Sequence, residues 1–490
     1  MEQKVVSLDS VGRVTASQNA APACATGGCG TPPKGGSAEL PAHIREKIKE
    51  HPCYSEEAHH FFARIHVAVA PACNIQCHYC NRKYDCANES RPGVVSERLT
   101  PEQAVRKVKA VAAAMPNLSV VGIAGPGDAL ADYRHTFETF RLLRETMPDL
   151  TLCLSTNGLA LPDHVDAIRE AGVDHVTVTM NAIDPHVAEG IYAWIFWDHQ
   201  RRTGLEAARI LIERQLRGIE MLTAAGVLVK INSVMIPGVN DDHLEAVNAA
   251  VKERGVFLHN VMPLISDPAH GTHYGLTGQR GPTPAELKSL QDRMGDGARL
   301  MKHCRQCRAD AVGLLGEDRS QQFGLESLPE NPEIDPEKRA AYRAIVEKER
   351  ADRRKEAADA RDAIRRWGPA EPILVAVASK GGGRVNQHFG HAREFQIFEV
   401  SENGARFTGH RRVDRYCSGG EGEDDVLDAT LLALDGVSAL LTAKIGRCPR
   451  QRLADAGITV IDDYAFDYVE TAIARWLAAT AAEEETARIA

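Results

Sequence analysis

A short apolar strand followed by an amphipathic helix recurs through residues 51 to 316, and this alternation constrains the fold more than any other feature. We predict six such strands, RIHVAVA from Arg64, LSVVGIA from Leu118, LTLCLST from Leu150, HVTVTMN from His175, VLVKINSV from Val227 and VFLHNVM from Val256. Strands that alternate with helices favour an α/β fold with a parallel sheet. Six units do not complete an eight-stranded barrel, so we expect a partial (βα)6 barrel of the TIM-like type.

Polar side chains occupy one face of several of these strands. Successive side chains along a strand point to opposite sides of the sheet. The residues that face away from the aliphatic side are His66, Cys153, Ser155, Asn157, Thr177, Thr179, Asn181, Lys230 and Asn232. A solid barrel core is aliphatic on both faces, so we expect these strands to line a polar chamber. In such barrels the chemistry lies in the loops that follow the carboxyl ends of the strands.

Three closely spaced cysteines follow the first strand. The stretch PACNIQCHYCNRKYDC places Cys73, Cys77 and Cys80 in a C-x3-C-x2-C pattern. A cubane iron–sulfur cluster normally takes four thiolates, so three of them leave one iron open to an outside ligand. The pattern, with Tyr79 before the third cysteine, resembles the radical S-adenosylmethionine (SAM) superfamily, in which SAM chelates the open iron. The alternative is a zinc knuckle that lacks its fourth ligand.

The other cysteines suggest two more ligand sets by their positions. Cys304 and Cys307, in HCRQCRAD beyond the sixth strand, return to the open side of the barrel. The two sets are Cys86, Cys304 and Cys307, and Cys53, His66 and Cys153, in which an imidazole replaces one thiolate. Plainer interpretations stay open: a buried apolar cysteine for Cys153, a hydrogen-bonded core histidine for His66, and a redox dithiol or half a zinc site for Cys304 and Cys307.

Several longer motifs together resemble one family. HPCYSEEAHH, VAPACNIQCHYCNRKYDCANESRPGV, IAGPGDAL, CLSTNGL, KINSVMIPGVN, MPLIS and CRQCRADAVGLLGED are similar to the NifB family, the radical SAM maturases of the nitrogenase cofactor. The resemblance covers residues 51 to 318. Ala129 stands where that family usually has proline, which changes the stiffness of the loop and leaves its neighbours in place.

The resemblance implies roles for named residues. Cys73, Cys77 and Cys80 hold the SAM-cleaving [4Fe-4S] cluster, and the two further sets each hold one [4Fe-4S] substrate cluster. The implied SAM contacts are Gly127, Asp128, Asn157, Thr179, Asn181 and the backbone around Ile231. The charges near the rim that either assist or form structural ion pairs are Glu89, Arg91 and Lys230.

The resemblance also implies a reaction and partners. One SAM donates a methyl group, a second yields a 5'-deoxyadenosyl radical, and two cubanes fuse around a carbide, with an added sulfur, into an eight-iron precursor. The implied partners are an iron–sulfur cluster donor scaffold, cofactor carrier and assembly proteins of the nitrogenase pathway, and a low-potential electron donor. The implied class is an enzyme of nitrogen fixation.

Beyond the barrel the composition changes twice. We expect a flexible tail over residues 1–50, the barrel over 51–318, a charged helical linker over 319–370, a second α/β domain over 371–480 and a short tail over 481–490. HFGHA and IGRCP in the second domain resemble NifX-like cofactor-binding domains. His388, His391 and Cys448 are candidate contacts to the finished cluster there, or ordinary surface side chains.

Composition limits the alternatives. A net charge of -9 and a pI near 6.1 argue against binding to nucleic acid or a membrane surface, and twelve cysteines without a signal-peptide core suggest a reducing, cytoplasmic setting. Two rival functions remain: a radical SAM peptide modifier with auxiliary clusters, and a non-enzymatic iron–sulfur cluster carrier.

Overall fold

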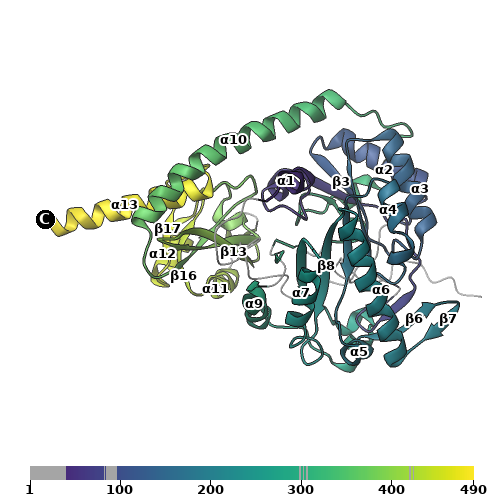
Figure 1. Ribbon diagram of the computed structural model, residues 1–490. Coiled ribbons are helices and arrows are strands. Elements are labelled where there is room, and N and C mark those ends of the chain that lie inside the picture. Colours follow the sequence, from purple (N-terminus) through teal and green to yellow (C-terminus); the bar gives the residue numbers. More distant parts are fainter. Residues whose placement is uncertain are drawn as a thin grey trace, which may run out of the picture.

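The computed structural model describes residues 40–81, 83, 86, 97–296, 299–301, 303–304, 307–418, 421–422 and 424–489 (Figure 1). Two α/β units are joined by one long helix. Cys24, Cys29, Glu89 and Arg91 lie outside the described residues.

The first unit is built on one curled sheet with the strand order β10-β1-β3-β4-β5-β8-β9. Its parallel strands are the six predicted ones: β1 Ala63–His66, β3 Leu118–Ile123, β4 Thr151–Thr156, β5 His175–Thr179, β8 Leu228–Met235 and β9 Leu258–Pro263. β10 Val312–Gly313 pairs antiparallel with β1. The predicted partial barrel is confirmed, and β10 was missed because two residues carry no periodicity.

Helices cover the aliphatic face of this sheet. They include α2 Pro101–Ala114, α3 Tyr133–Thr146, α4 Val165–Glu170, α6 Gly204–Ala224 and α7 Leu244–Glu253, with α1 Ala42–Ile48, α5 Pro185–Glu189, α8 His273–Thr277 and α9 Pro284–Arg293 at the periphery. α2 shows why such helices begin where they do. The Thr100 hydroxyl accepts a hydrogen bond from the Gln103 backbone, and the Gln103 side chain accepts one from the Thr100 backbone. Such a cap stabilises a helix by about 1 kcal/mol.

The opposite face of the sheet carries a row of residues that crosses four neighbouring strands and includes histidine and cysteine. In the strand register, His66 pairs with Gly122, Gly122 with Cys153, and Cys153 with His175. Residues paired across neighbouring strands point to the same side of the sheet. We call His66, Gly122, Cys153 and His175 the inner row. The row lies on the face that residue parity predicts to be polar.

A small antiparallel sheet stands beside the barrel. It consists of β2 Ile75–Cys77, β6 Tyr192–Trp197 and β7 Gln200–Arg202, in that order. β2 is part of the cysteine loop that follows β1, so this sheet fixes the loop to the chain between β5 and α6.

The charged segment after the barrel forms α10 Pro336–Trp367. α10 runs from the barrel to the second unit (Figure 1). It is not solvated all round, because Arg339, Val346, Arg350, Ala360 and Ile364 are buried. The Arg339 guanidinium donates to the Leu118 carbonyl at 2.8 Å and to the Asp149 carboxylate at 2.7 Å. A buried arginine is tolerated there because its charge is paired with the Asp149 carboxylate.

The second unit has a mixed sheet with the order β13-β12-β11-β16-β17. Its strands are β11 Ile373–Val377, β12 Glu394–Ser401, β13 Gly404–Arg412, β16 Val437–Leu441 and β17 Thr459–Ile461. Its helices are α11 Asp424–Ala433, α12 Arg447–Asp455 and α13 Val469–Ile489, and β14 Cys417–Ser418 pairs with β15 Glu421–Gly422. This is the smaller α/β domain that the sequence predicts.

Candidate active site and cluster ligands

Cys73, Cys77 and Cys80 lie together in the loop after β1. Cys77 is buried, while Cys73 and Cys80 are half-buried. Burial raises the pKa of the Cys77 thiol well above its usual range, and the neighbouring Cys80 and Cys73 raise it further. Three thiolates this close repel one another unless a cationic group binds between them. The donor set therefore fits an iron–sulfur cluster.

The nine cysteines whose side chains the structure describes are all free thiols. Among the described residues, no three His, Cys, Asp or Glu side chains converge on a point that would suit a single metal ion. The ligands of a cubane each bind a different iron, so they need not converge in that way.

Side chains from other elements hold the cysteine loop in place. The Gln76 amide donates to the carbonyls of Cys77 at 3.0 Å and Cys80 at 2.8 Å. The Asn157 amide, at the end of β4, donates to the Asn74 side chain at 2.7 Å and lies 3.8 Å from the Cys73 sulfur. Asn157 was predicted to contact SAM, and it lies beside the first cysteine of the loop.

Gly127 lies against the backbone of the same loop. A Cβ at Gly127 would lie 2.1 Å from the Ala72 carbonyl oxygen, so no side chain fits. Its N–H donates to the Ala70 carbonyl at 2.7 Å, and the Asp128 N–H donates to Ala72 at 2.7 Å. The close approach needs glycine for lack of space.

Asp128 is buried and bonded to protein groups. Burial raises the pKa of its carboxyl despite four hydrogen-bond donors. These donors are the backbone N–H groups of Leu130 at 2.9 Å, Ala131 at 3.0 Å and Asn157 at 2.5 Å, and the Thr156 hydroxyl at 3.1 Å. The carboxylate thus ties the loop after β3 to the end of β4.

Asn181 has a similar connecting role. Its amide donates to the hydroxyls of Tyr79 at 2.7 Å and Tyr192 at 3.0 Å, and its carbonyl oxygen accepts from the Val234 N–H at 2.8 Å. It therefore joins the cysteine loop, β6 and β8.

The two other residues predicted to contact SAM occupy adjacent strands. The Thr179 carbonyl accepts from the Gln215 side chain at 2.8 Å, and the Gln215 amide also donates to the Asn157 carbonyl at 2.7 Å. Ile231 is fully buried in the aliphatic core, so only its backbone is available to the chamber.

His66 and Cys153 belong to the inner row, separated by Gly122. A Cβ at Gly122 would lie 2.8 Å from Cδ2 and 3.2 Å from Nε2 of His66, so glycine leaves room for the imidazole. The Nδ1 atom of His66 lies 3.2 Å from the Arg308 carbonyl oxygen. Strands are about 4.8 Å apart, so two spacings separate His66 from Cys153 by roughly 10 Å at the backbone.

Cys53 reaches this row through its neighbour His51. The Cys53 N–H donates to Nδ1 of His51 at 3.2 Å, and the His51 ring lies 4.4 Å from the His175 ring. The structure thus brings the segment of Cys53 to the row that carries Cys153 and His66.

His51 and His175 were not among the predicted site residues. Both are buried, and burial lowers the pKa of His51 and brings the pKa of His175 to about 3. Nε2 of His51 and both ring nitrogens of His175 make no hydrogen bond with a described residue. The alternation of side chains along the strand could have identified His175, because it shares a strand face with Thr177 and Thr179.

Cys304, a member of the second predicted set, lies beside β9, which is an edge strand of the sheet. Asn260 of β9 donates to the Cys304 sulfur at 3.3 Å. His303 lies 2.9 Å from the Pro52 carbonyl, so the segment that carries Cys304 contacts the segment that carries Cys53. Cys86 is half-buried. Its grouping with Cys304 and Cys307 stays a prediction.

Two motifs of the second unit also meet. The rings of His388 and His391 lie 4.7 Å apart, and residue 388 forms a parallel bridge with Lys444. Burial, then His391 and Lys444, lowers the pKa of His388. Cys448 is exposed in the first turn of α12, which follows the Lys444 segment. HFGHA and KIGRCP thus lie side by side beyond the carboxyl ends of β11 and β16.

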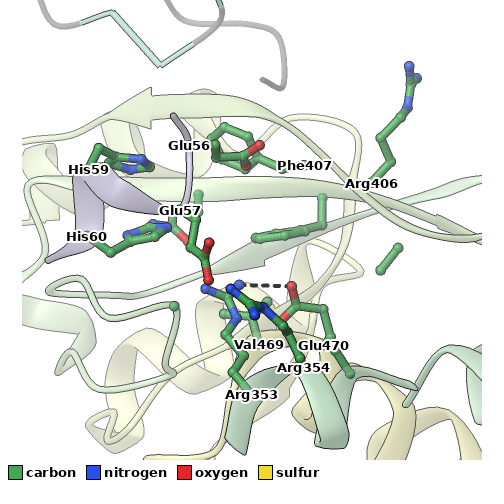
Figure 2. Close-up of a pocket in the computed structure, with 15 residues that line it drawn as sticks. Glu56, Glu57, His59, His60, Arg353, Arg354, Arg406, Phe407, Val469 and Glu470 are labelled. Carbon is green, nitrogen blue, oxygen red and sulfur yellow. Dashed lines mark hydrogen bonds and ion pairs between the residues drawn. The ribbon is translucent and has the colours of Figure 1, made fainter. Parts of the chain in front are cut away.

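A cavity of about 390 Å³ lies between the two units (Figure 2). Figure 2 shows Glu56, Glu57, His59 and His60 of the first unit facing Arg353, Arg354 and Glu470. Arg353 donates to Glu470 at 2.9 Å, and the His59 ring stacks 5.1 Å from His303. None of the predicted cluster ligands is among the described residues that line this cavity. It joins the units and is not the chamber of the inner row.

No helix among the described residues is both long and apolar enough to cross a membrane.

Comparisons with known proteins identify the family of this chain. Residues 67–250 match the family model of the radical SAM superfamily, and residues 371–479 match that of the dinitrogenase iron-molybdenum cofactor domain.

The chain is 58% identical over 476 residues to the FeMo cofactor biosynthesis protein NifB of Sinorhizobium fredii, covering 96% of this chain and 97% of that protein. It is 62% identical over 429 residues to the Rhodobacter capsulatus NifB, covering 87% and 95%. A solved structure, methylornithine synthase PylB, is similar at 15% identity with a TM-score of 0.33, over 54% of this chain and 72% of that one. The chain therefore belongs to the NifB family of FeMo cofactor biosynthesis proteins, as a radical SAM enzyme with a NifX-like domain at its C-terminal side.

Proposed function

We propose that this enzyme fuses two [4Fe-4S] substrate clusters, with a carbide taken from SAM and an added sulfur, into the eight-iron precursor of the nitrogenase cofactor. One observation carries the proposal. His66 and Cys153 share the inner row, while Cys304, held by Asn260, lies at the open edge of the same sheet. Two substrate sites beside one three-cysteine loop suit a fusion reaction and exceed what cleavage of SAM alone requires.

The ligands divide into one resident set and two substrate sets. Cys73, Cys77 and Cys80 hold the resident [4Fe-4S] cluster, which when bound supplies the electron that cleaves SAM. Three ligands leave one iron free of protein, which suits a chelating substrate. The substrate sets are Cys53, His66 and Cys153, and Cys86, Cys304 and Cys307. Incomplete protein ligation suits clusters that must leave the enzyme after fusion.

The remaining residues orient SAM and shape the chamber. Gly127, Thr179 and the backbone at Ile231 contact SAM in this proposal, and the Gly127 backbone is held against that of Ala72 in the cysteine loop. Asp128, Asn157 and Asn181 act mainly as positioning residues, because their hydrogen bonds hold the loops around the cysteines. A 1 Å misplacement of such groups can slow a reaction about 10²-fold.

The second unit receives the finished cluster in this proposal. The rings of His388 and His391 lie 4.7 Å apart, and this closeness supports a shared ligand. Cys448 supplies an exposed thiol in the first turn of α12, in the segment that follows Lys444. The proposed partners are a cluster donor scaffold, cofactor carrier and assembly proteins, and a low-potential electron donor.

The test is anaerobic reconstitution with iron and sulfide, followed by SAM and dithionite. We expect about twelve irons per chain, and both S-adenosylhomocysteine and 5'-deoxyadenosine as products. Cys77→Ala should hold about eight irons and form no 5'-deoxyadenosine. Cys153→Ala and Cys304→Ala should keep the SAM-cleaving cluster and form less S-adenosylhomocysteine, because a substrate cluster is missing.

The rival functions predict other results. Formation of 5'-deoxyadenosine without S-adenosylhomocysteine would favour a radical SAM peptide modifier. Neither product from a fully loaded chain would favour a cluster carrier. Product formation that survives Cys77→Ala would contradict the proposed SAM site.

A further inference from the structure

Cys53 lies in a short loop outside the barrel sheet, and we call residues 49–57 the Cys53 loop. The thiol is half-buried. The backbone N–H groups of Tyr54 and Ser55 both donate to the His51 carbonyl at 3.0 Å. This single turn of backbone encloses Cys53, so the position of the thiol depends on how the whole loop is held.

The inner side of the Cys53 loop is attached to the barrel sheet. Tyr54 is buried, and its hydroxyl lies 3.3 Å from the Val176 carbonyl oxygen of β5 and 3.4 Å from the Leu228 carbonyl oxygen of β8. The Tyr54 ring lies 4.7 Å from the His175 ring of the inner row. The sheet therefore holds the middle of the loop beside the inner row.

The two ends of the Cys53 loop are joined by one side chain of α10. Arg350 is 1% exposed. Its Nη2 atom donates to the Lys49 carbonyl at 2.6 Å, and its Nε atom lies 3.6 Å from the Glu57 carboxylate. Its Nη1 atom donates to Glu347 of α10 at 3.0 Å. A guanidinium is rigid and planar, so these contacts hold the two ends of the loop at a fixed separation.

Aromatic side chains that follow the loop hold the Arg350 guanidinium in place. Its central carbon lies 5.7 Å from the centre of the Phe61 ring and 5.3 Å from that of the Phe62 ring. Both rings are buried in one apolar cluster with Val346 of α10. Contacts between a cation and an aromatic ring are strongest where water is excluded. The guanidinium is therefore fixed both by α10 and by the segment after the loop.

Two buried arginines of α10 hold different parts of the first unit. Arg339 bonds to the Leu118 carbonyl and the Asp149 carboxylate, which lie outside the Cys53 loop. Arg350 instead bonds to both ends of that loop. Replacing either arginine should lower stability, because both are buried and bonded. Only the replacement of Arg350 should also move Cys53.

We infer that Arg350 is a positioning residue for the substrate cluster proposed at Cys53, because it closes the loop that presents this thiol. The inference rests on the proposed function, in which Cys53 is a ligand. The other two ligands of that set, His66 and Cys153, lie on strands, where the sheet fixes them. Bonds to a metal tolerate deviations of only about 0.2 Å, so a ligand on a loop needs a support from outside the loop. The charged helix that joins the two units supplies that support.

The test measures how firmly each cluster is held. The variants are Arg350→Met, Arg350→Lys and Glu57→Gln, and the matched control is Arg339→Met. After anaerobic reconstitution, bathophenanthroline disulfonate is added, and the release of iron is followed over time. Pulsed electron paramagnetic resonance of the reduced chain follows the nitrogen coupling of the cluster that binds the His66 imidazole. Cys53→Ala, alone and combined with Arg350→Met, completes a double-mutant cycle.

We expect Arg350→Met to release about four of its irons roughly tenfold faster than the wild type, because changes beside metal ligands weaken binding about 10- to 100-fold. The low end of this range applies because Arg343 still bonds to Glu50 of the loop at 3.0 Å. The nitrogen coupling should disappear at the same faster rate, which identifies the cluster. Arg350→Lys and Glu57→Gln should each accelerate release about threefold, since one of the two contacts remains.

The control and the double variant separate this role from general stability. Arg339→Met should release iron at the wild-type rate. The resident cluster should be retained in every Arg350 variant. Combining Arg350→Met with Cys53→Ala should give no faster release than Cys53→Ala alone, because Arg350 acts through that thiol.

Three outcomes would overturn the inference. The first is wild-type iron release in Arg350→Met when Cys53→Ala releases iron faster. The second is an equal acceleration in Arg339→Met, which would indicate a general loss of stability. The third is additivity in the double variant, which would show that Arg350 acts apart from Cys53. If Arg350→Met does not fold, Arg350→Lys and Glu57→Gln decide by the same measurements. Unchanged release in Cys53→Ala itself would instead contradict the ligand set of the proposed function, and the inference with it.

Discussion

Gly122→Ala tests whether His66 binds a substrate cluster, without removing any ligand. Gly122 lies between His66 and Cys153 in the inner row. Its new methyl group would lie 2.8 Å from Cδ2 and 3.2 Å from Nε2 of the imidazole. Ordinary contacts begin near 3.4 Å, so the ring must retreat by roughly half an ångström.

The size of that shift decides the expected effect. Metal–ligand distances tolerate deviations of about 0.2 Å, so a displaced His66 would lose its bond to a cluster iron. Changes beside metal ligands typically weaken binding about 10- to 100-fold. Stability should be little affected. Replacing glycine by alanine lowers the conformational entropy of the unfolded chain, which stabilises the folded state by about 0.4–1 kcal/mol and offsets the crowding.

The assay counts iron per chain and measures both SAM products after anaerobic reconstitution. We expect Gly122→Ala to retain about eight of twelve irons, to form less S-adenosylhomocysteine, and to cleave SAM at the wild-type rate. His66→Ala should behave in the same way. Gly295→Ala is the matched control, because no atom lies within 4 Å of a Cβ there. Full iron content with normal product formation in Gly122→Ala would refute a ligand role for His66.

Three further predictions concern other parts of the chain. Gly127→Ala should abolish both SAM products and lower the free energy of unfolding by about 3 kcal/mol, because its Cβ would lie 2.1 Å from the Ala72 carbonyl oxygen. Product analysis and thermal unfolding check these two effects. Burial lowers the pKa of His259 from 6.5 to about 3. Between these two values the unfolded chain binds a proton at His259 that the folded chain does not. As the pH falls from about 6 to 3, His259 should therefore lower the free energy of unfolding by about 1.4 kcal/mol per pH unit. Urea unfolding at several pH values should show a shallower slope in His259→Gln, and an unchanged slope would contradict the assignment. Arg339→Met should destabilise the chain by about 1–3 kcal/mol, whereas the exposed Arg365→Met should change the urea midpoint little.

The fold and the cysteine loop were accessible from sequence because their signals are local. The six parallel strands follow from apolar runs separated by helical patterns, and all six are present. Cys73, Cys77 and Cys80 lie within one loop, so their spacing predicts a shared ligand. β10 has two residues and no periodic pattern, and it could not be predicted in that way.

The assignments of individual polar residues were harder, because one residue type serves several purposes. Asp128 and Asn181 are residue types that can bind SAM. The Asp128 carboxylate, however, already accepts hydrogen bonds from four protein groups, and the Asn181 side chain already bonds to three. His175 begins its strand and is not predicted as a site residue from the sequence, although it lies in the inner row beside Cys153.

By itself the sequence determined the class of fold, the order of the domains and the likeness to one family, because periodicity, spacing and motifs are properties of consecutive residues. Only the tertiary structure decided which distant residues share a chamber. His66, Gly122, Cys153 and His175 span more than a hundred residues, and the hydrogen-bond register of four strands aligns them. Register and burial depend on all the strands packing at once, so no single stretch of the chain encodes them.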